Sequence, residues 1–281
     1  MRGTPLAALS SRRRFLNNSV TFGIAGLTQN ASGQPSATQA SNQPALIAAA
    51  SDLQFALPEL LAAFHSQHPL LPRATAQLGS SGVMATQMIR GAPISLLLSA
   101  DPSHAQRVQA AGLSQGALVQ YGIGTLAFAC PKNSTLKLDA EGLAFRTFYA
   151  SIARNTSATV PKFAIANPEH APYGRAAKQA LINLGIWDLV KAHLVLGENI
   201  SQATQYITSG AAAAGVTALP LCNAPAVADQ LQWIALPQKL HEPLDQTMVL
   251  AKRAPPTAVA FYEFIQGITA KAILARYGLQ G

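Results

Sequence analysis

The feature that most constrains the fold is a regular alternation of short apolar runs with amphipathic helical stretches, which starts near Ala45. The apolar runs predict strands at residues 44–51, 73–79, 94–101, 122–131, 162–168, 192–199, 214–219 and 245–252. The intervening stretches predict helices at residues 52–69, 81–91, 102–112, 173–187, 201–212 and 256–278. Strands that alternate with helices are typical of an α/β architecture with parallel sheets. Breaks in this rhythm near residues 121–125 and 237–247 favour two lobes.

The first 44 residues have a different character. Ser11-Arg12-Arg13-Arg14-Phe15-Leu16 matches the pattern of a twin-arginine export signal, and the apolar stretch that follows is too short to span a membrane. Ala31-Ser32-Gly33 is suited to cleavage. We therefore predict a signal peptide at 1–33, a polar linker at 34–44, and export to the periplasm. An ordinary basic N-terminal segment is the alternative.

Charge and cysteine content narrow the function further. The net charge is +8, of which four charges come from arginines in the first 34 residues, which leaves a mildly basic body at +4. The body has no cluster of lysines and arginines, so nucleic-acid binding is not expected. Cys130 and Cys222 are the only cysteines, and the sequence leaves open whether they pair.

Four junctions between a strand and a helix share small, polar or Pro/Gly residues. They read AAASDL, GSSGVM, NPEHAPYGRAA and GENISQA, and they contain Ser51, Ser81, Tyr173 and Ile200. The free N–H groups and positive dipole of a helix N-terminus bind anions, although ordinary helix capping explains any single junction. Because ligands of open α/β sheets bind beyond the carboxyl ends of strands, four such junctions favour an anion site.

The body also resembles the periplasmic molybdate-binding proteins of ABC importers, the ModA type of the type II solute-binding fold. The resemblance covers about residues 45–279 and rests on spaced motifs in a fixed order. They are AAASDL.FAL.EL...F, GSSG....QM..GAP..L.LSAD, ANPEHAPYGRAA..AL..LG.W, LGENISQA.Q.I.SGAA.AG and A.F..F......AILARYG.

The resemblance implies two lobes, each a mostly parallel sheet flanked by helices, with the ligand in the cleft between them. Lobe I would comprise residues 45–122 and 240–281, and lobe II residues 123–239. It implies a non-enzymatic binding protein, without a cofactor, that delivers molybdate, and tungstate as well, to a membrane permease. Sulfate or another oxyanion, and a sensor that takes no part in transport, remain alternatives. A monomer is expected.

Residue by residue, the resemblance implies that Ser51 and Ser81 each donate a hydroxyl and an N–H to the oxyanion. Tyr173 and Ile200 would each donate a backbone N–H. Asp52 and Ser80 are possible supporting residues: Ser80 would cap the helix, and Asp52 would point away from the anion towards its own helix N-terminus. Some relatives have a tyrosine where this chain has Ala218, so that contribution is missing here.

Other chemistry is less well supported. His65 and His68 are spaced to share a helix face, but no third metal ligand lies near them in the sequence. His170 has no nucleophile that a motif would pair with it, and the chain has neither a P-loop nor a G-x-S-x-G motif. We also expect Pro58, inside the predicted first helix, to kink it.

Overall fold

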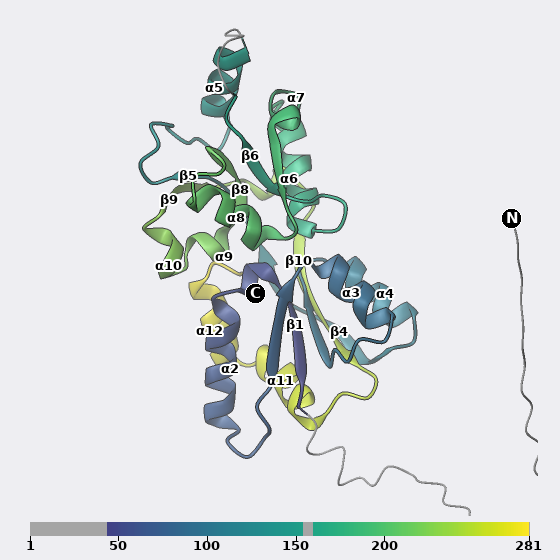
Figure 1. Cartoon of the computed structure of the whole chain (residues 1–281). Coiled ribbons are helices and arrows are strands. Elements are labelled where there is room, and N and C mark those ends of the chain that lie inside the picture. Colours follow the sequence, from purple (N-terminus) through teal and green to yellow (C-terminus); the bar gives the residue numbers. More distant parts are fainter. Residues whose placement is uncertain (1–43, 154–159, 281) are drawn as a thin grey trace, which may run out of the picture. The chain divides into compact units, whose positions relative to one another are not determined.

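The computed structural model describes residues 44–153 and 160–280. The predicted signal peptide and all of the predicted linker except Pro44 lie outside these residues. The described chain forms two five-stranded sheets with helices on both faces, shown in Figure 1.

The first sheet, with its helices, is called lobe I. Its strands are β1 (Leu46–Ala50), β2 (Thr75–Gly79), β3 (Leu96–Ser99), β4 (Ser114–Gly124) and β10 (Leu244–Ala251), in the order β2-β1-β3-β10-β4. β1 runs parallel to β2 and β3, whereas β10 runs antiparallel to β3 and β4. β10 follows all five strands of the second sheet in the sequence, so the first sheet is made from two separate parts of the chain.

The second sheet, with its helices, is called lobe II. Its strands are β5 (Leu126–Pro131), β6 (Phe163–Ala166), β7 (Leu194–Gly197), β8 (Ala214–Ala218) and β9 (Leu231–Ala235), in the order β7-β6-β8-β5-β9. β6 is parallel to β7 and β8, and β5 is antiparallel to β8 and β9. The two-lobe α/β fold is confirmed. Both sheets are mixed, because β10 in the first and β5 in the second run against the other four strands.

Side chains alternate across the first sheet with the period of two that strands impose. Ile47, Leu98 and Met248 face one helical layer, whereas Ala48 and Val249 face the other. The first layer consists of α2 (Ala56–Gln67), α11 (Pro256–Gln266) and α12 (Ile268–Arg276), and the second of α3 (Ser81–Ile89) and α4 (Pro102–Ala110), as Figure 1 shows.

The helices of lobe II cover its sheet in the same way. α5 (Leu143–Ala153), α6 (Pro172–Asn183) and α7 (Trp187–Val190) pack on the face that carries Phe128 and Phe163. Ile207 of α8 (Ile200–Thr208) and Val227 of α10 (Pro225–Ala228) pack against the opposite face. The remaining short elements are η1 (Ser51–Leu53), η2 (Lys191–His193), α9 (Leu219–Cys222) and η3 (Gln238–Leu240).

Two helix predictions need correction. The first helix begins at Ala56, after the short 3₁₀ turn η1, so Pro58 lies in its first turn and does not kink it. N–H groups in the first turn have no partner within a helix, so proline removes nothing there. The C-terminal helix is interrupted at Gly267, where α11 gives way to α12.

The same break bears on membrane insertion. None of the helices within 44–153 and 160–280 is by itself long and apolar enough to cross a membrane. α11 and α12 meet that criterion only as a pair, across a bend of 68°.

Candidate functional site

The N-termini of four helical segments meet at one small cavity. Its wall contains Ser51 at the start of η1, Ser81 at the start of α3, Tyr173 in the first turn of α6 and Ile200 at the start of α8. The space open to the centre of a water molecule is about 10 Å³. The four residues singled out in the sequence are therefore brought together, two from each lobe. Whether they contact a ligand stays a prediction.

Ser81 is fully buried and its side chain is oriented by a backbone contact. The hydroxyl oxygen accepts a hydrogen bond from the N–H of Ala100, at 3.0 Å. A hydroxyl has one proton to donate, and an accepted bond leaves that proton free. Because Ser81 and Ala100 both line the cavity, the geometry suits the Ser81 hydroxyl to act as a donor to a ligand.

Ser51 has an equivalent arrangement that spans the two lobes. Its Oγ accepts the N–H of Ser201 at 3.3 Å, while its carbonyl accepts the Ser201 hydroxyl at 2.7 Å. Ser201 is the second residue of α8, so these contacts attach the start of α8 to the end of β1. The acceptor role of Ser51 Oγ is again used by an amide, which leaves its proton to donate.

The other two residues contribute backbone rather than side chains. Tyr173 follows Pro172 at the start of α6, and Ile200 follows the N-cap Asn199, whose side chain accepts the N–H of Gln202 at 3.1 Å. N–H groups in the first turn of a helix have no carbonyl partner within it. Both N–H groups are thus available to an anion.

Ser80 does not cap its helix through its side chain, which corrects one expectation. It occupies the N-cap position of α3, but its hydroxyl donates to the carbonyl oxygen of His170 at 2.6 Å and lies 3.1 Å from the Nδ1 of that residue. His170 belongs to lobe II, so Ser80 joins the lobes beside the cavity. Ser80 therefore stabilises the contact between the two lobes.

Asp52 is fully buried in the cavity wall, and its side chain is directed differently from our expectation. Oδ2 accepts the Tyr173 hydroxyl at 3.0 Å and the Gln246 Nε2 at 2.7 Å. Burial raises the pKa of Asp52 to about 6, against the lowering effect of these hydrogen bonds and of the N–H groups of Asp52 and Leu53. The N–H groups of its own helix N-terminus therefore affect the pKa of Asp52 less than burial, Tyr173 and Gln246 do.

Gln246 and Tyr121 complete this network, and the sequence interpretation missed both. The Tyr121 hydroxyl donates to Gln246 Oε1 at 2.7 Å, which fixes the amide so that Nε2 faces Asp52. Gln246 is a fully buried polar residue in the apolar strand β10. A glutamine inside the run DQTMVLAK was a usable signal, because buried polar side chains require partners.

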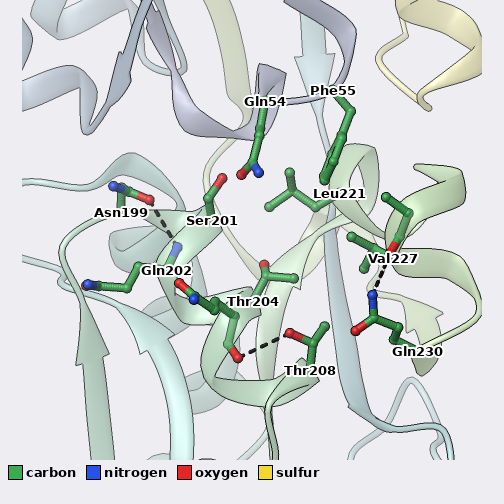
Figure 2. Close-up of a pocket in the computed structure, with 12 residues that line it drawn as sticks. Gln54, Phe55, Asn199, Ser201, Gln202, Thr204, Thr208, Leu221, Val227 and Gln230 are labelled. Atoms are coloured by element: carbon green, nitrogen blue, oxygen red, sulfur yellow. Dashed lines mark hydrogen bonds between the residues drawn. The ribbon is translucent and has the colours of Figure 1, made fainter.

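A second, larger cavity lies next to the first and shares Asn199 with it. It measures about 490 Å³, and Figure 2 shows Gln54 and Phe55 on one side and Ser201 and Thr204 of α8 on another. All its lining side chains are uncharged. Its size and its open amide-rich wall do not fit a single small anion, which favours the small cavity as the ligand site.

The metal and disulfide alternatives receive no support from the side chains that are described. The Nε2 of His65 accepts the N–H of Ala74 at 3.2 Å, and the ring of His68 packs at a tilt against that of Phe64. No group of three His, Cys, Asp or Glu suited to a metal is found within residues 44–153 and 160–280. Cys130 and Cys222 are both buried and free.

A two-lobed α/β fold with a small, donor-lined cavity between its lobes defines a solute-binding protein. The sequence from 45 to 280 matches the family of bacterial extracellular solute-binding proteins, and the chain belongs to that family.

The molybdate-binding protein ModA of Rhodobacter capsulatus is 30% identical over 207 residues, which span 73% of this chain and 76% of the relative. The periplasmic molybdate-binding protein of Azotobacter vinelandii superposes with a TM-score of 0.73 at 27% identity, covering 84% of this chain and 98% of that one.

The fold extends beyond these relatives. The sulfate-binding protein SubI of Mycobacterium tuberculosis superposes with a TM-score of 0.63 at 13% identity, covering 84% of this chain and 86% of that one. At that identity the likeness shows the fold alone.

Proposed function

We propose that this protein is the substrate-binding component of an ABC importer, that it binds molybdate and also tungstate in the periplasm, and that it delivers the anion to a membrane permease. The observation that carries the proposal is the meeting of four helical N-termini at one small cavity. The molybdate-binding relatives support the choice of anion. Export through the twin-arginine signal, a monomeric state and the absence of catalysis and of a cofactor belong to the same proposal.

The donor set suits a desolvated dianion. The hydroxyls and N–H groups of Ser51 and Ser81, with the N–H groups of Tyr173 and Ile200, offer six donors to four oxygens. Hydrogen bonds to a charged group contribute about 1.5–3 kcal/mol each, so together they offset the loss of hydration without a cationic side chain.

Capture would proceed by closure of the lobes. The anion first contacts Ser51 and Ser81 of lobe I, and lobe II then brings in the N–H groups of Tyr173 and Ile200. The contacts of Ser80 with His170 and of Ser51 with Ser201 hold the closed arrangement. A permease recognises the closed form because only that form presents both lobes in a fixed relation.

Calorimetry on the purified protein with molybdate, tungstate, sulfate and phosphate tests the proposal. We expect heat and an upward thermal shift with molybdate and tungstate and much weaker responses with the two lighter anions. Binding of sulfate in preference would reassign the anion, and no response to any oxyanion would refute the proposed function.

A further inference from the structure

The carboxyl group of Asp52 has no obvious place in a site for dianions. Asp52 follows Ser51 directly, is fully buried and forms part of the wall of the small cavity. A tetrahedral dianion in that cavity and an ionised Asp52 would place two like charges in one desolvated space, which is strongly unfavourable.

The hydrogen bonds of Asp52 are made by one oxygen and leave the other able to carry a proton. Oδ2 accepts two bonds, from Tyr173 and from Gln246. Oδ1 is buried and makes no hydrogen bond of good geometry with any residue within 44–153 and 160–280. A proton on Oδ1 would remove the buried charge while Oδ2 keeps both of its hydrogen bonds.

Among residues 44–153 and 160–280, the groups that neighbour Asp52 include no compensating cation. The titratable side chains that face Asp52 are the phenols of Tyr173 from α6 and Tyr121 from β4, and burial raises the pKa of both well above the ordinary value, so they stay neutral. The groups packed from the other elements are uncharged: Gln246 from β10, Ser81 of α3 with its N-cap Ser80, and Ile200 of α8. Of the two cations of α6, Arg175 is paired with Asp101 and Lys178 lies over the ring of Trp187.

We propose that Asp52 is protonated when the cavity holds a tetrahedral dianion, so that anion capture takes up one proton from the solvent. The carboxylate gains a proton at an oxygen and no other bond forms or breaks. This inference rests on the proposed function and adds to it that affinity falls as pH rises. Burial already raises the pKa of Asp52 to about 6, and the negative charge of a bound anion would raise that pKa further.

The number of protons taken up is measured by titrating the full-length protein with sodium molybdate at about pH 7.5 in two buffers of different ionisation enthalpy. We expect the two binding heats to differ by the difference in buffer ionisation enthalpy multiplied by close to one proton per anion. The affinity should weaken by up to about tenfold per pH unit on the alkaline side. Equal heats in the two buffers would overturn the inference.

Two variants assign the proton. Asp52→Asn imitates the neutral acid, so it should bind molybdate without proton uptake and with an affinity independent of pH. Asp229→Asn removes an exposed carboxyl remote from the cavity wall and should behave as the wild type. Proton uptake that persists in Asp52→Asn would place the proton elsewhere and overturn the assignment.

Infrared difference spectra of the wild type give a readout that does not depend on whether a variant folds. Addition of molybdate should produce a band of a protonated carboxyl and remove a carboxylate band. Molybdate binding without that change would overturn this inference and leave the proposed function intact, whereas no binding at all would refute the proposed function itself.

Discussion

Gly82, the second residue of α3, lies against His170 of lobe II, and Gly82→Ala tests whether that contact affects ligand binding. A Cβ built on Gly82 would lie 2.5 Å from the carbonyl oxygen of His170, which belongs to lobe II. Ordinary contact begins at 3.4 Å, so the lobes must separate there by about 0.9 Å. A backbone carbonyl cannot turn aside as a flexible side chain can.

That displacement has a cost that can be worked out. The bond of 2.6 Å from Ser80 to the same carbonyl would be lost, and the N–H of Tyr173 would move away from Ser81. Loss of one hydrogen bond to a charged ligand corresponds to about 1.5–3 kcal/mol, or about 10- to 150-fold in the dissociation constant. Within lobe I the added Cβ would lie 3.1 Å from Cε1 of His104, so that side chain must shift slightly. The preference of a helix for alanine over glycine, about 1 kcal/mol, offsets this cost.

We therefore expect Gly82→Ala to bind the ligand more weakly than the wild type and to be no less stable in the absence of ligand. Calorimetry with molybdate measures the first, and thermal unfolding without ligand measures the second. Val83→Ala, at the adjacent and exposed position, is the matched control and should change neither. An affinity within twofold of the wild type in Gly82→Ala would refute the idea that this contact forms in the ligand-bound state.

Three further predictions concern single side chains. Ser81→Ala should weaken molybdate binding by about 1–3 kcal/mol in calorimetry, since one donor to a charged oxygen is lost, whereas Ser66→Ala, on the exposed side of α2, should not. Arg175→Ala removes the partner of Asp101 in an ion pair that joins the lobes and is partly exposed. It should lower affinity by less than about 1 kcal/mol, with a loss that disappears at high salt; a large loss that salt does not alter would contradict this reading. His104 is buried with neither ring nitrogen bonded to a described residue, and burial lowers its pKa to about 4. His104 binds a proton more readily in the unfolded protein than in the folded protein. The stability that its neutral form contributes should therefore be complete above about pH 6.5 and decline as pH falls towards 4. Urea unfolding of His104→Gln should lack that part of the acid dependence, and an unchanged pH profile would contradict it.

The sequence predicted the parts of the fold whose signal is local. The strands around Ile47, Leu97 and Ile165 are short, apolar and bounded by turn residues, so their period and length identify them without tertiary information. The helix N-termini at Ser81 and Ile200 were recognisable for the same reason, because small polar residues precede an amphipathic run.

β9 was not predicted, and of β4 only residues 122–124 fell within a predicted strand; the burial of both strands explains why. β4 (Ser114–Gly124) is mostly half-buried and shows no regular alternation, and β9 (Leu231–Ala235) leaves Trp233 38% exposed. Both lie at sheet edges, where a strand is stabilised by pairing with a neighbour that is distant in sequence. α5 (Leu143–Ala153) was missed as well, although Phe145 and Tyr149 contribute to the core of lobe II.

The distinction between local and long-range signals applies to the site as well, because the environment of Asp52 is set by residues distant in sequence. Ser51, Ser81, Tyr173 and Ile200 were identified from local junctions, since a helix N-terminus offers its donors wherever the chain carries it. The surroundings of Asp52 come from Tyr173, Gln246 and Tyr121, which are 121, 194 and 69 residues away in the sequence. Only the pairing of β10 beside β4 and the approach of α6 bring them together. The donors of an anion site can thus be read from sequence, whereas the protonation state of a carboxyl beside them depends on long-range contacts. A pH profile of binding consequently tests the tertiary arrangement more directly than the loss of any single donor.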